Sequence, residues 1–266
     1  MLTAELHAVF RRTRVKVLLG SMFAIPVFLA LAVYASGGPG TGRGPAFLDL
    51  VSHNGVFAAL AGLTVTIPFF LPLTVAVVAG DTISGEASLG TLRYLLIRPS
   101  GRARLLGMKA VTVAVFCMAA ALSVAVGGLL AGAVLFPIGR VVTLSGTTLP
   151  LADGIGRALA AAGIVGLSLL GLAAIGMFVS TLTDVPVGAM AATVAAAVVS
   201  AILDSVPQVH AIHPWLFTHH WLAFGDLLRA PVAWHAIVRD LLLQAGYVAV
   251  FLTAAWARFT TRDVLA

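Results

Sequence analysis

The chain has 266 residues, of which 60% are hydrophobic and only 10% are charged, and its mean hydropathy is +1.06. A water-soluble domain carries roughly 25% charged residues, so this composition excludes a soluble globular protein and predicts a chain surrounded by lipid. Backbone polar groups in lipid must be paired internally, and long apolar runs without alternation favour helices over a barrel. The net charge of +6 is explained by lipid anchoring and topology, so no nucleic-acid partner is expected.

Residues 1–16 are predicted to form an interfacial amphipathic helix. Leu2, Leu6 and Val9 share one helical stripe, and Arg11 and Arg14 lie opposite. A polar extension of the first span would give a similar pattern and stays open as an alternative. The first apolar run has no small-residue cleavage site, so we expect it to be retained as a span.

The predicted fold class is all-α: a polytopic membrane protein with six transmembrane helices in a single transmembrane domain over residues 1–266. Most of the sixteen Lys and Arg residues fall in segments that would then share one side, which predicts that both termini are cytoplasmic. Between the spans we expect a cytoplasmic loop at 80–109, an external re-entrant or interfacial segment at 207–238, and a tight turn before Pro186. The spans are expected at 17–36, 56–79, 110–136, 157–180, 187–206 and 239–258.

Small residues and prolines predict how the spans pack. Gly128 and Gly132 form a GxxxG pattern in the third span, which favours close helix contact. Pro68 and Pro72 lie in the second span and predict a kink. A gating role for that kink is the alternative to a fixed bend.

The sequence indicates neither catalysis nor an ion relay on this chain. The spans contain almost no ionisable residues, so no ion relay is evident. Ser168 has no histidine in a span to activate it and should bond its own helix backbone. The sequence before Lys109 lacks the Walker A spacing. We therefore predict no enzyme, no catalytic residues and no ATP hydrolysis on this chain; the single cysteine, Cys117, allows no internal disulfide.

Most of the seven histidines lie between residues 207 and 240, interleaved with tryptophan and phenylalanine. This mixture favours short helices at the outer membrane interface, where aromatic rings settle. His210 and His213 have an i,i+3 spacing that could also bind a metal. The interfacial interpretation is preferred, and no metal is predicted.

The loop at 80–109 is predicted to form two helices joined by a turn. Ser88 can cap a short helix with a leucine face, and Pro99 should end it, after which a second helix continues into the third span. Glu86 and the loop arginines are expected to be exposed. A basic loop that binds lipid headgroups is the alternative, but headgroups require neither a leucine face nor a carboxylate.

The loop resembles that of bacterial type-2 ABC transporter permeases. The resemblance rests on Glu86-x-x-x-Gly90-Thr91-Leu92, followed by Leu95-Leu96, Pro99, Leu105-Leu106, Gly107 and Lys109. It extends in outline to the whole chain: an N-terminal elbow helix, six spans and a hydrophobic external segment before the last span. It implies that the loop is a coupling helix that docks into a separate ATP-binding cassette ATPase subunit. The implied docking residues are Gly85, Glu86, Leu89, Gly90, Thr91 and Arg93.

The same resemblance implies the function. The chain would be the permease subunit of an ATP-driven exporter in the bacterial cytoplasmic membrane, moving an amphiphilic or hydrophobic substrate, with a second permease copy, identical or different. It would bind no cofactor, since ATP and magnesium belong to the partner ATPase. Thr64, Thr66, Phe69 and Phe70 lie where a substrate path would run. A non-transporting membrane scaffold or sensor is the alternative, and the substrate's identity stays open.

Overall fold

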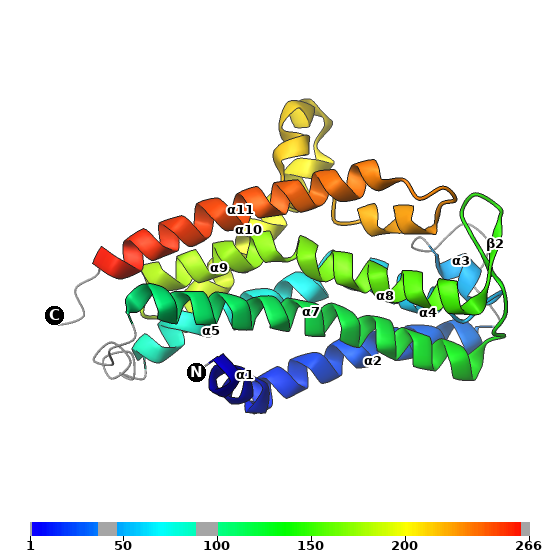
Figure 1. Ribbon diagram of the computed structural model, residues 1–266, viewed down its shortest axis with the longest axis horizontal. Helices are drawn as coiled ribbons and strands as arrows, with labels where there is room; N and C mark the ends of the chain where they lie inside the picture. The colour runs from blue at the N-terminus through cyan, green and yellow to red at the C-terminus, as the bar shows by residue number, and fades with distance from the viewer. Residues whose placement is uncertain (1, 37–46, 89–100, 262–266) are drawn as a thin grey trace.

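The computed structural model describes residues 2–36, 47–88 and 101–261 (Figure 1). The only strands in these ranges form one short antiparallel hairpin that pairs Val141 with Leu149 and Val142 with Thr148. The all-α prediction is therefore confirmed. In chain order the elements are α1 (Leu2–Arg11), α2 (Thr13–Ala35), α3 (Leu48–Val51), α4 (Phe57–Thr66), α5 (Phe70–Ser88), α7 (Arg102–Leu135), β1 (Val141–Val142), β2 (Thr148–Leu149), α8 (Leu151–Ser168), α9 (Leu170–Leu182), α10 (Pro186–Ser205), the 3-10 helices η1 (Pro207–Trp215) and η2 (Ala223–Leu228), and α11 (Trp234–Thr261).

Each apolar run of the sequence forms helix. In the described part of the chain, five helical stretches are long and apolar enough to cross a membrane, and α4 with α5 makes a sixth if that bent pair is one span. The helices run further than hydropathy predicts: α5 continues to Ser88, α7 begins at Arg102 and α11 begins at Trp234. Backbone hydrogen bonding thus continues past the points where the side chains become polar.

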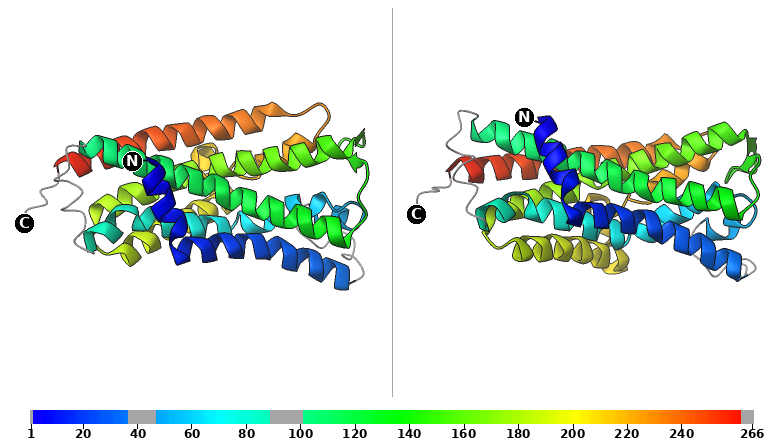
Figure 2. Two further views of the ribbon diagram at one scale, coloured as in Figure 1. Left: turned by 60° about the horizontal axis from the view of Figure 1, so that its bottom comes forward. Right: turned by 90° about the horizontal axis from the view of Figure 1, so that it is seen from below.

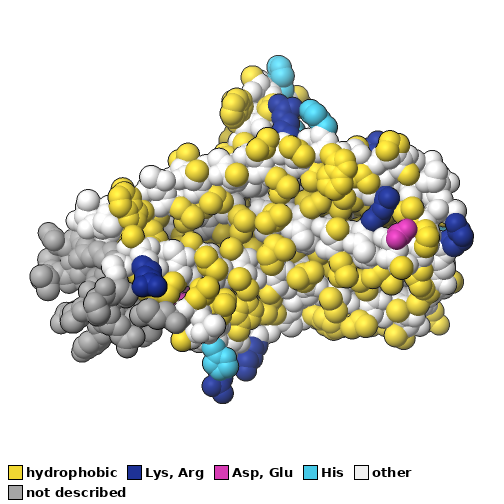
Figure 3. Space-filling model, viewed as in Figure 1, with side chains coloured by type: hydrophobic (Ala, Val, Ile, Leu, Met, Phe, Trp, Pro, Cys, Tyr) yellow, Lys and Arg dark blue, Asp and Glu magenta, His cyan; other side chains and the backbone are white. Residues whose placement is uncertain are grey.

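The helices lie roughly along one long axis (Figures 1 and 2). The long helix α7 packs against α2, α4 and α8, and α9 packs against α5 and α11. Large side chains such as Phe57, Phe116 and Leu172 are fully buried between them. Apolar side chains also cover the sides of the bundle (Figure 3), with Phe28 and Leu242 each 69% exposed. An apolar exterior of this kind is what lipid solvation requires.

The two ends of the bundle differ. The C-terminal ends of α5 and α11, the start of α7 and the turn between α9 and α10 lie toward one end, which we call the loop end (Figure 1). The helix α1 packs against α7 near this end. The short helix α3 and the β1–β2 hairpin lie at the other end, here called the hairpin end. Between the two ends, η1 and the end of α10 project from the side of the bundle beyond α11.

The N-terminal helix is shorter than predicted. It ends at Arg11, because Arg12 has an extended conformation (φ −60°, ψ 130°) that starts a new helix. Leu6 and Val9 are partly buried, as the amphipathic pattern predicts, whereas Leu2 on the same stripe is 37% exposed. The prediction of one interfacial helix over residues 1–16 was therefore wrong in its C-terminal bound.

The predicted kink in the second span is confirmed. The helices α4 and α5 are separated by a short break and are bent by 60° relative to each other. Pro68 lies in this break, where its missing N–H and its ring are incompatible with a continuous helix. The neighbouring Phe69 and Phe70 are 53% and 39% exposed.

The GxxxG pattern of α7 marks a close contact with the region of α4. A Cβ atom on Gly132 would lie 2.0 Å from the carbonyl oxygen of Gly55, and one on Gly128 would lie 2.5 Å from Cα of Ala59. These obstacles are backbone atoms, so no side-chain rotation could relieve them. The backbones approach this closely because neither glycine has a side chain, and the predicted close packing is confirmed.

We predict opposite effects for two glycine substitutions within α7. Gly132→Ala should separate α7 from Gly55 and lower stability by about 1–3 kcal/mol, as overpacking does. Gly107→Ala has open space around its Cβ and should be neutral or stabilising by up to about 1 kcal/mol, because alanine is the better helix former. Thermal unfolding in detergent measures both. Equal effects of the two variants would contradict the close-contact interpretation.

Candidate functional site

A buried lysine joins three elements at the loop end. Lys109, in α7, is 3% exposed, and its Nζ lies 2.6 Å from Oε1 of Glu86 in α5 and 3.2 Å from Oε1 of Glu5 in α1. A buried ammonium group is stable only when it is paired in this way. The side chain of Glu5 is 27% exposed and that of Glu86 is 14% exposed. The three side chains therefore form a partly buried polar cluster at the loop end.

Two further contacts connect α5 at this end. Arg12, in the break between α1 and α2, lies 3.4 Å from a carboxylate oxygen of Asp81. Inside the bundle, Ser180 of α9 accepts hydrogen bonds from the backbone N–H groups of Ile83 (3.1 Å) and Ser84 (2.9 Å). Its own hydroxyl lies 2.7 Å from the carbonyl oxygen of Gly80. The last turns of α5 are therefore bonded to α9 on one side and to α1 and α7 on the other.

The predicted docking residues separate into two groups. Gly85 and Glu86 lie in the last turns of α5, whereas Leu89, Gly90, Thr91 and Arg93 fall outside the described residues. The expectation that Glu86 is exposed was wrong, because its carboxylate turns inward to pair with Lys109. The sequence-based expectation did not consider that Lys109, once buried, requires a carboxylate partner.

The four residues placed on a substrate path line neither the pocket at the loop end nor the groove along α11. Thr64 bonds the carbonyl oxygen of Leu60 (2.9 Å), and Thr66, fully buried, bonds that of Gly62 (2.8 Å), so both hydroxyls serve their own helix. Phe69 and Phe70 contact each other at the α4–α5 break, with ring centroids 5.6 Å apart. Other residues line the pocket at the loop end and the apolar groove along α11.

A buried carboxylate lies where the sequence indicated none. Asp240 in α11 is fully buried, and it accepts hydrogen bonds from Ser168 and from Nε2 of Gln244 (3.0 Å). Trp221 donates its indole N–H to the backbone oxygen of Ser168 (3.0 Å). The prediction that the spans lack a buried acid was therefore wrong. The missed signal was the i,i+4 spacing of Asp240 and Gln244, which puts both on one helix face.

Ser168 itself behaves as predicted. Its hydroxyl lies 2.8 Å from the carbonyl oxygen of Ile164, one turn earlier in α8. The hydroxyl also contacts Asp240, so it links α8 to α11 as well. Gly171 leaves the space for this arrangement, since a Cβ there would lie 2.2 Å from Oε1 of Gln244.

The aromatic segment before α11 is packed rather than interfacial over much of its length. Phe217 and Trp221 are 5% exposed and Phe224 is 1% exposed, whereas Trp215 and Trp234 point outward. The interfacial interpretation was thus wrong for the three buried rings, which fill the space beside α8 and α11. The helix η2, which contains Phe224, packs on both of these helices.

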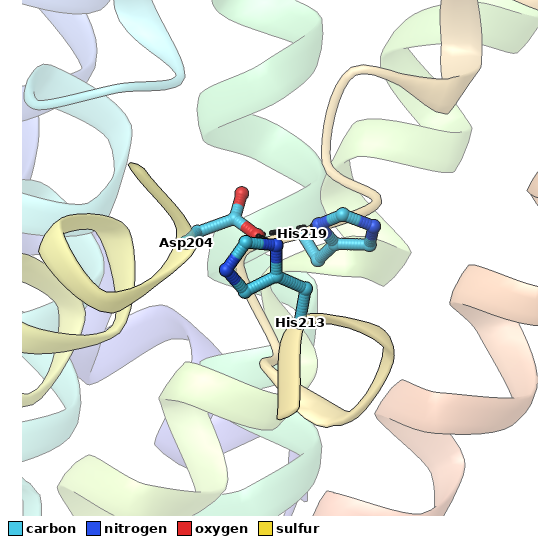
Figure 4. A group of neighbouring side chains, drawn as sticks. All are labelled: Asp204, His213 and His219. Carbon is cyan, nitrogen blue, oxygen red and sulfur yellow. Dashed lines mark hydrogen bonds and ion pairs between the residues drawn. The ribbon is translucent and has the colours of Figure 1, made fainter. Parts of the chain in front are cut away.

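The histidines of this segment also separate. His213 and His219 converge on Asp204 at the end of α10 (Figure 4), whereas His210 is exposed and not part of this group. Burial lowers the pKa of the neighbouring His220, and the positive charge of His219 lowers it further. The i,i+3 pair proposed from the sequence is therefore not the pair that the fold brings together.

These features define a class: an all-α protein with an apolar exterior whose described residues include five or six helices able to cross a membrane. A family profile described as protein of unknown function (DUF2705) matches residues 43–265, so the chain belongs to that family. Curated proteins gave no match to the sequence. The family description names no activity, so the function must be argued from the geometry of the chain.

Replacement of the buried lysine should release α1. Lys109→Met removes the only group that contacts both Glu5 and Glu86 in the described contacts, and it should cost about 1–3 kcal/mol in stability. Hydrogen exchange of residues 2–11 should accelerate in this variant. Arg104→Met, on an exposed position of the same helix, is the matched control. If the amide hydrogens of α1 exchange at the same rate in both variants, Lys109 does not hold that helix in place.

Removal of the buried carboxylate should loosen the contact between α8 and α11. Asp240→Ala would leave Ser168 and Gln244 without a shared partner, at a cost of about 1–3 kcal/mol. Asp153→Ala, exposed in α8, should change the unfolding temperature little. Thermal unfolding of both variants in the same detergent gives the comparison, and a harmless Asp240→Ala would show that the cluster is not structural.

Proposed function

We propose that this chain is the permease subunit of an ATP-driven ABC exporter in the bacterial cytoplasmic membrane. A separate ATPase would supply ATP binding and hydrolysis with magnesium, and the exported compound would be amphiphilic or hydrophobic. The observation that carries the proposal is the Lys109 group, because it connects α1 to both helices that flank residues 89–100. Those residues contain the loop whose sequence resembles the coupling helix.

The contacts supply a route for motion from a docked loop into the bundle. A displacement of residues 89–100 must act on the end of α5 and the start of α7, since the chain is continuous. The Glu86–Lys109–Glu5 contacts would carry that displacement to α1. The Ser180 hydrogen bonds would carry it to α9. Glu86 would then connect α5 to α7 inside the bundle, and docking itself would fall to Gly85, Leu89, Gly90, Thr91 and Arg93.

The distribution of basic residues supports a cytoplasmic loop end. Arg11, Arg14 and Lys16 belong to the first helices, and Arg104 and Arg258 to the parts of α7 and α11 nearest the loop end. Short segments rich in arginine and lysine are retained in the cytoplasm. With both termini on that side, the hairpin end would face outward, and the ATPase would meet the loop from the cytosol.

A second permease copy and lipid would cover the exposed helix faces. The helix α10 packs on α5, α9 and η1, and it exposes Val187, Val199 and Ile202 by 54–71%. The faces of α2 and α11 are similarly apolar. Closure of the partner ATPases on ATP would move the two copies relative to each other and change the path between them.

Asp240 supports a second candidate, ion-coupled transport without an ATPase. A carboxylate buried in a membrane bundle is expensive and is often part of a proton or ion path. Here, however, its described partners are Ser168 and Gln244, as expected for a structural acid. Transport by the chain alone in vesicles, driven by a proton gradient, would favour this candidate. A scaffold or sensor would show neither gradient-driven nor nucleotide-driven transport.

Site-directed cross-linking tests the proposed docking. Cys117 is fully buried and can be replaced by serine to give a cysteine-free chain, to which Ser88→Cys is added at the exposed end of α5. Co-expressed with a candidate ABC ATPase from the same genome, this variant should cross-link to the ATPase through a short bifunctional reagent, with a yield that changes with nucleotide. We expect this cross-link because docking would bring the ATPase into direct contact with the loop end.

The control is Thr148→Cys, exposed in the hairpin at the opposite end, which should give no cross-link. Arg93→Ala in the loop should weaken co-purification of the ATPase without changing the unfolding temperature. Equal cross-linking from both ends, or a chain that never co-purifies with an ATPase, would overturn the proposal.

A further inference from the structure

The side-chain group at the end of α10 has the composition of a metal site. Asp204, His213 and His219 each point one ligand atom to the same place, and these atoms lie within 4.8 Å of one another (Figure 4). Two imidazole nitrogens and one carboxylate oxygen form a ligand set typical of zinc and other divalent first-row metals. We infer that Asp204, His213 and His219 bind a divalent transition-metal ion, with Zn²⁺ as the representative ion.

The hydrogen bonding of His213 leaves its Nδ1 atom able to bind a metal. Its Nε2 lies 3.2 Å from the carbonyl oxygen of Val206, and a carbonyl oxygen can only accept, so Nε2 carries the proton. In the neutral ring, Nδ1 is then a bare lone pair, and it faces Oδ1 of Asp204 at 3.9 Å. Metal-binding histidines usually donate their other N–H to a backbone carbonyl in this manner.

Two lone pairs that face each other repel unless a cation lies between them. His219 Nδ1 lies 2.5 Å from Oδ1 of Asp204, a direct hydrogen bond that an ion would replace. The 3.9 Å separation of His213 Nδ1 and the same oxygen is too long for a hydrogen bond, so a direct bond does not explain the position of His213. Ligands at about 2.0–2.2 Å from Zn²⁺ lie roughly 3–4 Å from one another. The spacing therefore fits a shared ion after small rotations of the rings.

The position of Asp204 adds a second electrostatic reason. It lies in the last turn of α10, which ends at Ser205. The C-terminal end of a helix is negative, so a carboxylate there is unfavourable and a cation is favourable. An ion bound between Asp204 and the two histidines would neutralise both the carboxylate and the helix end.

The backbone that presents the histidines is fixed before any ion binds. Thr218 bonds Ser200 of α10 at 2.8 Å, and the carbonyl oxygen of Phe217 accepts from Gln244 of α11 at 2.8 Å. Tyr247 bonds the carbonyl oxygen of Trp215 at 2.9 Å. His219 follows these anchored residues directly. Such preorganisation lowers the entropy lost on binding, while side-chain exposures of 16–33% leave the ligands accessible.

A bound ion would connect three consecutive pieces of chain. It would join the end of α10, the 3-10 helix η1 and the turn that leads to Trp221. The first two pieces form the part that projects from the bundle beyond α11 (Figure 1), where histidine and basic side chains gather in Figure 3. The expected consequence is a metal-dependent gain in the stability of this projection.

Metal titration of the purified chain tests the site. The chain is prepared without a polyhistidine tag, stripped with chelator and titrated with Zn²⁺ in detergent by competition with a chromophoric chelator. We expect one tight site per chain, an increased unfolding temperature and slower hydrogen exchange in residues 207–219. Substitution with Co²⁺ should give the visible absorption of nitrogen and oxygen ligands. Ca²⁺ and Mg²⁺, which prefer all-oxygen sites, should not reproduce these effects.

Variants assign the site to these three residues. His213→Ala, His219→Ala and Asp204→Asn should each weaken Zn²⁺ binding by at least about tenfold. His210→Ala, exposed on the same 3-10 helix, is the matched control and should bind as the natural chain does. A folded natural chain that binds no Zn²⁺, or equal loss in the control, would overturn the inference.

This experiment is independent of the proposed transport function, because it uses the chain alone. A chain that binds zinc but recruits no ATPase would remove only the permease proposal. A chain that recruits an ATPase but binds no zinc would remove only the metal site.

Discussion

A chain with an apolar exterior has no water along its sides, so each polar group that enters the bundle must find its partner in the chain itself. Three groups show how this constraint is satisfied. Lys109 lies between two carboxylates, Asp240 lies between Ser168 and Gln244, and Ser180 bonds the backbone of α5. Each group joins helices that are distant in sequence, and together they specify which helices are neighbours more sharply than apolar contact could.

These polar contacts act together with close backbone packing. Glycines bring α7 within contact of the α4 region, so the backbones at the centre of the bundle pack closely, whereas α2, α10 and α11 present broad apolar faces. In the proposed permease, a closely packed centre with an ionic group at one end would pass a displacement of the loop on to the neighbouring helices. The same group explains why Glu86, a docking residue by sequence resemblance, is an internal residue by geometry.

Much of the fold follows from the sequence alone. The apolar runs, Pro186 at the start of α10 and Pro68 at the α4–α5 break act through local physics, and local patterns predict them. The ion pairs and the proposed metal ligands depend on contacts across the fold: Lys109 and Glu5 are separated by 104 positions. His213 meets Asp204 only because η1 turns back toward the end of α10. The i,i+4 spacing of Asp240 and Gln244 is a local pattern from which this buried carboxylate could have been predicted.

The burial of Asp240 has a consequence for biosynthesis. Its helix, α11, contains the least hydrophobic window of the five unbent candidate spans, and an aspartate in an isolated span opposes insertion into lipid. The partner that satisfies this acid, Ser168, is made earlier, at the junction of α8 and α9. Pairing with a helix made earlier would lower the cost of placing this acid in lipid. Loss of Ser168 would remove one of the two described hydrogen bonds to Asp240 and so raise the cost of inserting α11.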